Sequence, residues 1–188
     1  MEETLLPTLV PGRLYLVIHP HPRRALLGLV ADLALQGPVR VLDGGNWLNA
    51  YTVAAHLRQH TPNIQPLLQR ICFSRAFTCT QMLALVITAA AASVRAPGAV
   101  LVLDMLSTFH DENIKAGERL RLLHACLPHL RSMCAGGPVL VCIRPGDPAL
   151  VEVLIRTADE VSEMAPPPSD QAIQLSFLSC AQDVEYKK

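Results

Sequence analysis

The stretch LYLVIHPHPRRALLGLVADLALQ (residues 14–36) joins three kinds of sequence. Residues 14–18 are continuously apolar, as in strands that are buried on both faces of a parallel sheet. Residues 25–36 are rich in Leu and Ala and predict a helix. Between them, residues 19–24 consist of two histidines, two prolines and two arginines. We therefore expect a strand, a tight loop and a helix, a setting in which many proteins hold the phosphates of a nucleotide.

The same alternation of strand and helix continues along the chain. Further strands are predicted near 39–43, 71–74, 99–104 and 138–143, and helices near 25–36, 49–59, 78–94, 114–134 and 148–157. Gly and Pro residues at 37–38, 97–98 and 136–138 stop helices just before strands. Repeated units of this kind predict an α/β fold, a three-layer architecture in which a parallel β-sheet is flanked by helices.

The pattern predicts one domain over residues 1–188. It comprises an N-terminal extension (1–11), a core (12–145), a C-terminal helix and edge strand (146–180) and a tail (181–188). The edge strand is predicted because AIQLSFL (172–178) alternates apolar and polar residues after a proline-rich turn.

The composition favours a globular protein without a strong overall field. Of the 188 residues 51% are hydrophobic and 17% charged, and sixteen basic residues balance sixteen acidic ones. Residues 1–146 hold thirteen Lys and Arg against eight Asp and Glu, whereas 147–188 hold three against eight, which indicates a slightly acidic tail or a weakly basic face. The longest apolar run, residues 82–94, is shorter than the ~20 residues that cross a bilayer, so we expect no membrane association.

The cysteines indicate a cytoplasmic protein with reduced thiols. None has C-x-x-C spacing, most lie in apolar runs, and the acidic N-terminus MEETLLPTLV does not resemble a signal peptide. We expect buried thiols for the six cysteines, which are Cys72, Cys79, Cys126, Cys134, Cys142 and Cys180.

Charged residues gather where predicted strands end. Asp43 and Asp104 close two strands, and Arg23 and Arg24 follow a third, at the start of a helix. Ligands of parallel α/β sheets bind at the carboxyl ends of the strands, and a helix N-terminus favours anions. These four residues form the candidate nucleotide- or anion-binding site.

Four segments in order resemble the ATPase core of the RecA-like recombinases, especially their archaeal and eukaryotic branch and its paralogues. The RAF tripeptide at 75–77, followed by Gln81, is the most specific match. The resemblance covers residues 12–145 and implies a RecA-like P-loop NTPase core. The four segments are RLYLVI with ALLGLVADLAL (13–18 and 25–35), VRVLDGGNW (39–47), ICFSRAFTCTQM (71–82) and AVLVLDMLSTF (99–109).

The chain departs from that family where the phosphates would bind. A Walker A loop reads G-x-x-x-x-G-K-[ST], but residues 18–25 read IHPHPRRA. Ile18 and Arg23 replace the glycines, and the two prolines each remove an N–H donor. Arg24 replaces the compact charge of lysine, and Ala25 has no hydroxyl for Mg²⁺.

The catalytic carboxylate of the resembled family is missing as well. Gly45 stands where that family has its glutamate, a group worth ~10²–10⁴ in rate as a general base. Asp104, at the Walker B position, remains without its usual partners and predicts a poor Mg²⁺ site. We therefore expect no catalytic residue, no bound metal and no cofactor, and the sequence favours a protein that is not an enzyme.

These features predict a non-catalytic RecA-like protein, a pseudo-ATPase, that is an accessory or interaction partner in DNA recombination or repair. Its partner would be another protein, such as a recombinase or a second copy of the chain. DNA contact stays open, because the charges of 110–123 are mixed. The alternative is a nucleotide- or phosphate-binding enzyme that uses Arg23, Arg24, Asp43 and Asp104 in an atypical site.

Two other site chemistries compete for the same strand ends. His19 and His21 have i, i+2 spacing and could hold a divalent metal together with Asp43 or Asp104. The segment VLDGGNW (41–47) is similar to the strand end of methyltransferases, although the expected G-x-G is absent.

The polar residues of the loop after 43 have a structural interpretation too. Asn46 and Asn49 are candidates to cap the helix that begins near 49. Trp47 is interpreted as a core anchor or a partner contact.

Overall fold

A six-stranded, all-parallel sheet forms the middle layer of the molecule, in the order β3-β2-β4-β5-β1-β6. The computed structural model describes residues 8–20, 23–110 and 114–163. The strands are β1 (Leu14–Ile18), β2 (Val39–Asp43), β3 (Ile71–Arg75), β4 (Ala99–Leu103), β5 (Val139–Ile143) and β6 (Glu160–Glu163).

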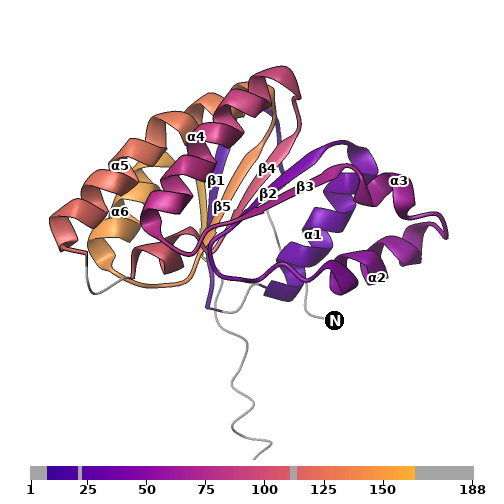
Figure 1. The fold of residues 1–188 in the computed structure, drawn as a ribbon, viewed down its shortest axis with the longest axis horizontal. Helices are drawn as coiled ribbons and strands as arrows, with labels where there is room; N and C mark the ends of the chain where they lie inside the picture. Colours follow the sequence, from indigo (N-terminus) through magenta and orange to yellow (C-terminus); the bar gives the residue numbers. More distant parts are fainter. Residues whose placement is uncertain (1–7, 21–22, 111–113, 164–188) are drawn as a thin grey trace, which may run out of the picture.

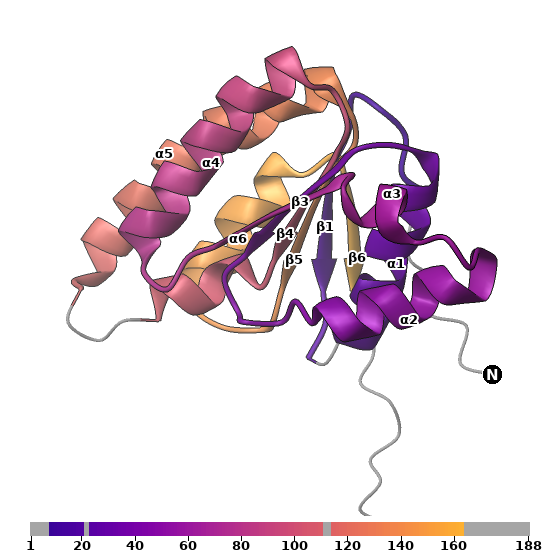
Figure 2. The same cartoon turned by 45° about the vertical axis from the view of Figure 1, so that its right-hand side comes forward.

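Helices cover both faces of the sheet, which confirms the predicted three-layer α/β architecture (Figure 1). One face is covered by α4 (Cys79–Arg95), α5 (Ala116–Met133) and α6 (Pro148–Thr157). The other is covered by α1 (Arg23–Gln36), α2 (Ala50–His60) and the short α3 (Gln65–Leu68), as Figure 2 shows. Two 3₁₀ turns, η1 (Met105–Phe109) and η2 (Cys134–Gly136), follow β4 and α5.

Three of the inner strands, β1, β4 and β5, are buried because their sequences are apolar at every position. All five residues of β1, of β4 and of β5 are buried. Along β1, Leu14, Leu16 and Ile18 pack in the core under α4, α5 and α6. Tyr15 and Val17 pack in the second core, under α1 and α2. The continuous apolar runs therefore supply two cores at once, as predicted.

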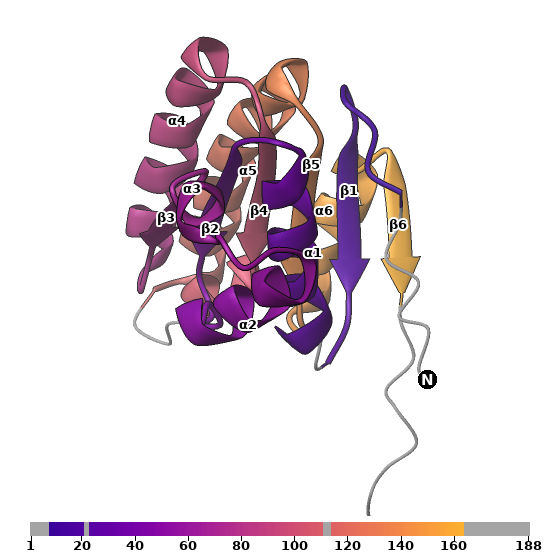
Figure 3. The ribbon, with the colours of Figure 1, turned by 90° about the vertical axis from the view of Figure 1, so that its right-hand side faces the viewer.

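The two edges of the sheet differ from the sequence-based expectation (Figure 3). Strand β3 was expected to be buried on both faces, but Cys72 and Phe73 are exposed because β3 is an edge strand. The opposite edge is β6, which the sequence did not predict, because EVSE has no apolar run. The strand expected at 172–178 lies outside the described residues.

A carboxylate clamp joins the first strand to the last one. Asp159 Oδ2 accepts a hydrogen bond from the Leu14 backbone N–H at 2.7 Å and lies 2.5 Å from Arg131 Nη1. The second terminal nitrogen of Arg131 donates to the Thr157 carbonyl. The hydrogen bond from Arg131, together with that from Leu14, lowers the pKa of Asp159.

The thiols are mostly buried, with one correction. Cys72 is exposed on β3, and Cys180 lies outside the described residues. The buried cysteines are Cys79, Cys126, Cys134 and Cys142. Over the ranges that the structure covers, none of the helices has the length and apolar character needed to cross a bilayer.

Candidate functional site

The carboxyl edge of the sheet collects charged residues in an order that follows the strands. Arg75 ends β3 and Asp43 ends β2, while Asp104 directly follows β4 and Arg144 directly follows β5. Because the strands are adjacent in the order β3-β2-β4-β5, the charges along this edge read plus, minus, minus, plus. Each aspartate therefore has an arginine at the end of a neighbouring strand or directly after it.

Asp43 is fully buried, and both of its carboxylate oxygens are engaged. Oδ1 accepts from the Trp47 backbone N–H at 2.9 Å, and Oδ2 accepts from the Leu48 N–H at 3.0 Å. Arg75 donates to Oδ2 through Nε at 3.2 Å and Nη2 at 3.0 Å. Charge-assisted bonds of this kind are about twice as strong as neutral ones, so Asp43 anchors the loop between β2 and α2.

The glycines of that loop allow its backbone to lie directly against Asp104. A Cβ on Gly45 would come within 2.4 Å of Asp104 Oδ2 and 2.8 Å of Trp47 Nε1. A Cβ on Gly44 would come within 2.7 Å of the Asp104 carbonyl oxygen. The position that would carry the catalytic glutamate of the resembled family thus has no room for any side chain.

Asp104 lies outside β4, where a strand residue was expected. Its φ of 50° is in the left-handed region, which aspartate tolerates better than most residues, and it turns the chain into η1. The hydroxyl of Ser107 donates to the carbonyls of Gly44 and Asp104, at 2.7 and 2.8 Å. The Asp104 side chain, 1% exposed, is therefore held between η1 and the glycine loop.

Arg144 supplies the positive charge that faces Asp104. Its Nη2 lies 2.6 Å from Asp104 Oδ2, although the angles are not those of a hydrogen bond. The same guanidinium lies 5.8 Å from the centre of the Trp47 ring, a cation–π contact. Because the Arg144 side chain is 49% exposed, it reaches the buried carboxylate from solvent.

Trp47 connects this edge to the start of α1. The residue is 8% exposed and belongs to the core under α1 and α2, which confirms its interpretation as a core anchor. Its carbonyl accepts from Arg23 Nε at 2.9 Å. Arg24 is exposed and, within the described ranges, forms no hydrogen bond or ion pair. Of the four candidate residues, the structure thus brings Arg23, Asp43 and Asp104 around Trp47, and Arg24 stays apart.

The polar loop residues divide into a cap and a turn. Asn49 caps α2, since its side chain accepts from the backbone N–H groups of Tyr51 and Thr52, as predicted. Asn46 has a φ of 56° and does not cap the helix.

The structure describes only part of the metal site that His19 and His21 would form. His19 is buried and its backbone N–H donates to the Ile143 carbonyl, while His21 lies outside the described residues. Among the residues placed by the structure, no three His, Cys, Asp or Glu side chains form a cluster that could hold a metal. Burial, and to a smaller extent the charge of Asp104, raises the pKa of the Cys142 thiol on β5, which keeps it a neutral and unreactive thiol.

The start of α5 behaves as a solvated helix start in the part that the structure describes. Glu118 and Arg121 form an ion pair at 2.6 Å, and the hydrogen bond from Arg121 lowers the pKa of Glu118.

Sequence reasoning missed the two arginines that complete the edge. Arg75 was noticed only as part of the RAF tripeptide, and Arg144 was not singled out. The available signal was positional: each follows or ends an apolar strand, as the aspartates do.

No protein-family model matches the chain, and no curated protein matches its sequence significantly. The site is therefore interpreted from its own geometry.

Proposed function

We propose that this chain is a non-catalytic protein with a RecA-like core, and that it acts as an accessory interaction partner in DNA recombination or repair. The observation that carries the non-catalytic part is the state of the carboxyl edge. Asp43 and Asp104 are each paired with an arginine, and the loop backbone fills the space at Gly45.

The charge pairing opposes the binding of Mg²⁺ with a triphosphate. A carboxylate that helps to hold Mg²⁺ must present an oxygen to the ion. Asp104 Oδ2 already faces the guanidinium of Arg144 at 2.6 Å, so Mg²⁺ would have to displace a cation from a buried carboxylate. Asp43 has no oxygen left without a partner, because its two oxygens together accept four hydrogen bonds.

Hydrolysis would need a carboxylate that the loop cannot accommodate. A side chain at Gly45 would overlap Asp104, since even the Cβ comes within 2.5 Å of the Asp104 Cβ. The backbone of residues 44–48 would have to be rebuilt before a general base could enter, and Asp43 anchors that backbone.

Exposed aromatic side chains support an interaction role. Phe73 and Phe77, on and just after the edge strand β3, are 40% and 71% exposed, and Tyr51 at the start of α2 is 87% exposed. Arg75 hydrogen-bonds the Leu48 carbonyl at 3.4 Å, which brings the start of α2 towards the end of β3. Exposed apolar groups next to a free strand edge are typical of protein contacts.

Thermal unfolding of the full chain with and without Mg-ATP tests the non-catalytic part. A ligand present at about 100 times its Kd stabilises the native state by ~2.7 kcal/mol, which in a protein of this size raises Tm by roughly 5–11 °C. We expect a change below ~1 °C at 5 mM Mg-ATP and no release of phosphate. A clear rise in Tm, lost in the Arg24→Ala variant, would instead support the alternative of an atypical nucleotide- or phosphate-binding site.

Affinity capture from cells that naturally express the chain tests the interaction part. We expect a recombination or repair protein, or a second copy, to co-purify, and the Phe77→Ser variant to lose it. Val94→Ser is the matched control, because Val94 is 81% exposed on α4, away from the carboxyl edge. Capture that survives Phe77→Ser would show that this surface is not used.

A further inference from the structure

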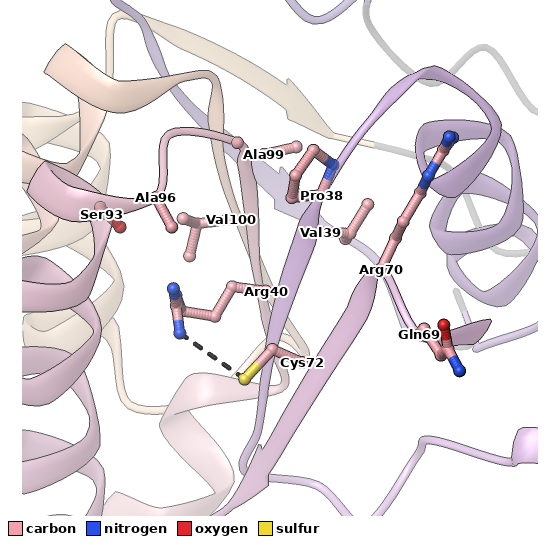
Figure 4. Close-up of a pocket in the computed structure, with 11 residues that line it drawn as sticks. Pro38, Val39, Arg40, Gln69, Arg70, Cys72, Ser93, Ala96, Ala99 and Val100 are labelled. Carbon is pink, nitrogen blue, oxygen red and sulfur yellow. Dashed lines mark hydrogen bonds between the residues drawn. The ribbon is translucent and has the colours of Figure 1, made fainter. Parts of the chain in front are cut away.

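A cavity lies at the amino ends of β2, β3 and β4, the opposite end of the sheet from the candidate site. Its volume is about 320 Å³, at the lower end of the range for ligand pockets. Its walls are mainly apolar and come from Pro38, Ala96 and Val100, with Arg40 among them (Figure 4).

Arg40 occupies an inward-facing position of the sheet. Side chains of a strand alternate between faces, so Arg40 shares its face with Leu42, which belongs to the core under α4 and α5. Its register neighbours are Cys72 on β3 and Val100 on β4. An arginine thus stands where the sheet otherwise packs apolar side chains.

Among the residues that the structure describes, the guanidinium of Arg40 has no anionic partner. The hydrogen bond that it forms there goes to Cys72 Sγ at 3.6 Å, and a thiol is a weak acceptor. Arg70, which also lines the cavity, is directed away from it and donates to the Ala34 and Leu35 carbonyls. Among the described residues around the cavity there is no carboxylate. A guanidinium that is partly withdrawn from water beside apolar walls is stabilised by an anion that can accept two parallel N–H bonds.

We propose that this cavity binds a small organic carboxylate with an apolar body. The carboxylate pairs with the free N–H groups of Arg40, and the body packs against Pro38, Ala96 and Val100. Ser93 adds no free donor, because its hydroxyl already donates to the Ala89 carbonyl. The volume holds about ten water-sized groups, the size of a branched or aromatic acid rather than a nucleotide. The inference is independent of the proposed function, since none of these residues belongs to the carboxyl edge.

Binding of phenylacetate to the full reduced chain tests the proposal, with the neutral isostere phenylacetamide as the matched ligand. Titrations followed by ¹H–¹⁵N correlation spectra, including the arginine Nε–H signals, report both affinity and location. We expect saturable shifts centred on the Arg40 side chain, at least tenfold weaker binding of phenylacetamide, and at least tenfold weaker binding of phenylacetate by Arg40→Met. Arg40→Lys is expected to lie between. Arg58→Met, at an exposed position of α2 on the other face of the sheet, is expected to bind like the unchanged chain.

Three results would overturn the proposal. Equal affinity for phenylacetate and phenylacetamide would show that the charge of Arg40 does not contribute to binding. Equal affinity for inorganic phosphate would show that any anion is attracted and that the apolar walls do not select. Absence of saturable binding up to 20 mM, in a folded chain, would leave Arg40 as a half-buried charge on β2 without a role in ligand binding.

Discussion

Replacement of Asp43 by asparagine removes a charge and almost no volume, and it separates an anchoring role from a ligand-binding role. In the unchanged chain the buried carboxylate accepts two bonds from Arg75 and two from backbone N–H groups. Asparagine keeps one oxygen that can accept these bonds. Its NH₂ group, which is itself a donor, would face at least one of the N–H groups that now bind the carboxylate. Each hydrogen bond to a charged group contributes ~1.5–3 kcal/mol, so losing about two of them predicts a cost of ~3–6 kcal/mol.

Urea unfolding followed by circular dichroism measures this cost. If Asp43 were kept for a ligand instead, its replacement would leave stability unchanged or raise it, as at many functional sites. Asp32→Asn, at an exposed position on α1, is the matched control and should change stability by less than ~0.5 kcal/mol. Arg75→Lys, which keeps the charge but not the two-pronged geometry, should cost ~1–2 kcal/mol and provides a measurable variant if Asp43→Asn unfolds. An Asp43→Asn loss below ~1 kcal/mol would refute the anchor.

Three further perturbations follow from the same structure. Gly45→Ala should lower the free energy of unfolding in urea by ~1–3 kcal/mol or more, because the added Cβ would overlap Asp104. Gly117→Ala, which has open space around it in α5, should leave that free energy unchanged or raise it by up to ~1 kcal/mol. Equal effects of the two substitutions would contradict the packed loop. Arg144→Met should destabilise by ~2 kcal/mol or more in the same assay, because it leaves the buried carboxylate of Asp104 without its cation. Asp104→Asn should change stability by less than ~1 kcal/mol, because the half-exposed guanidinium of Arg144 can then face water. A larger effect of Asp104→Asn than of Arg144→Met would refute the pairing. The pKa of Asp159 is lowered in the folded chain, so its contribution to stability is present above the unfolded pKa of ~3.9 and is lost as pH falls through the folded pKa. Asp159→Asn should therefore lower Tm at pH 6 and make the decline of Tm below pH 4 less steep. An unchanged decline would argue against the clamp.

The apolar strands were predictable because a strand that is buried on both faces carries apolar side chains at every position. LYLVI and VLVCI have no polar position, and their strands are β1 and β5 as expected. The strand β6, with the sequence EVSE, was not predicted because an edge strand can pair its backbone without burying its side chains, so its sequence need not be apolar. The same reason explains why β3 was expected to be more buried than it is.

The candidate site was predictable only in part, because strand order cannot be read from one sequence. Asp43 and Asp104 were found from their places at strand ends. Their pairing with Arg75 and Arg144 depends on β3 lying beside β2 and β5 beside β4, and these pairs come from distant parts of the chain. The sequence alone indicated that Gly45 stands where the resembled family has a carboxylate. Only the packing of Gly45 against Asp104 shows that there is no space for a side chain at this position.

The place of β1 in the sheet has a consequence for how the chain is made. Its two neighbours are β5 and β6, so Leu14 pairs with Val139 and Tyr15 with Glu160. During synthesis at ~5–20 residues per second, the apolar segment LYLVI leaves the ribosome well before β5 and β6 and waits several seconds for these strands to complete it. Pairings so distant in sequence also slow folding, because the loop between them must close first. Nascent chains that stop before residue 139 thus carry an unpaired hydrophobic strand and are expected to depend on chaperones.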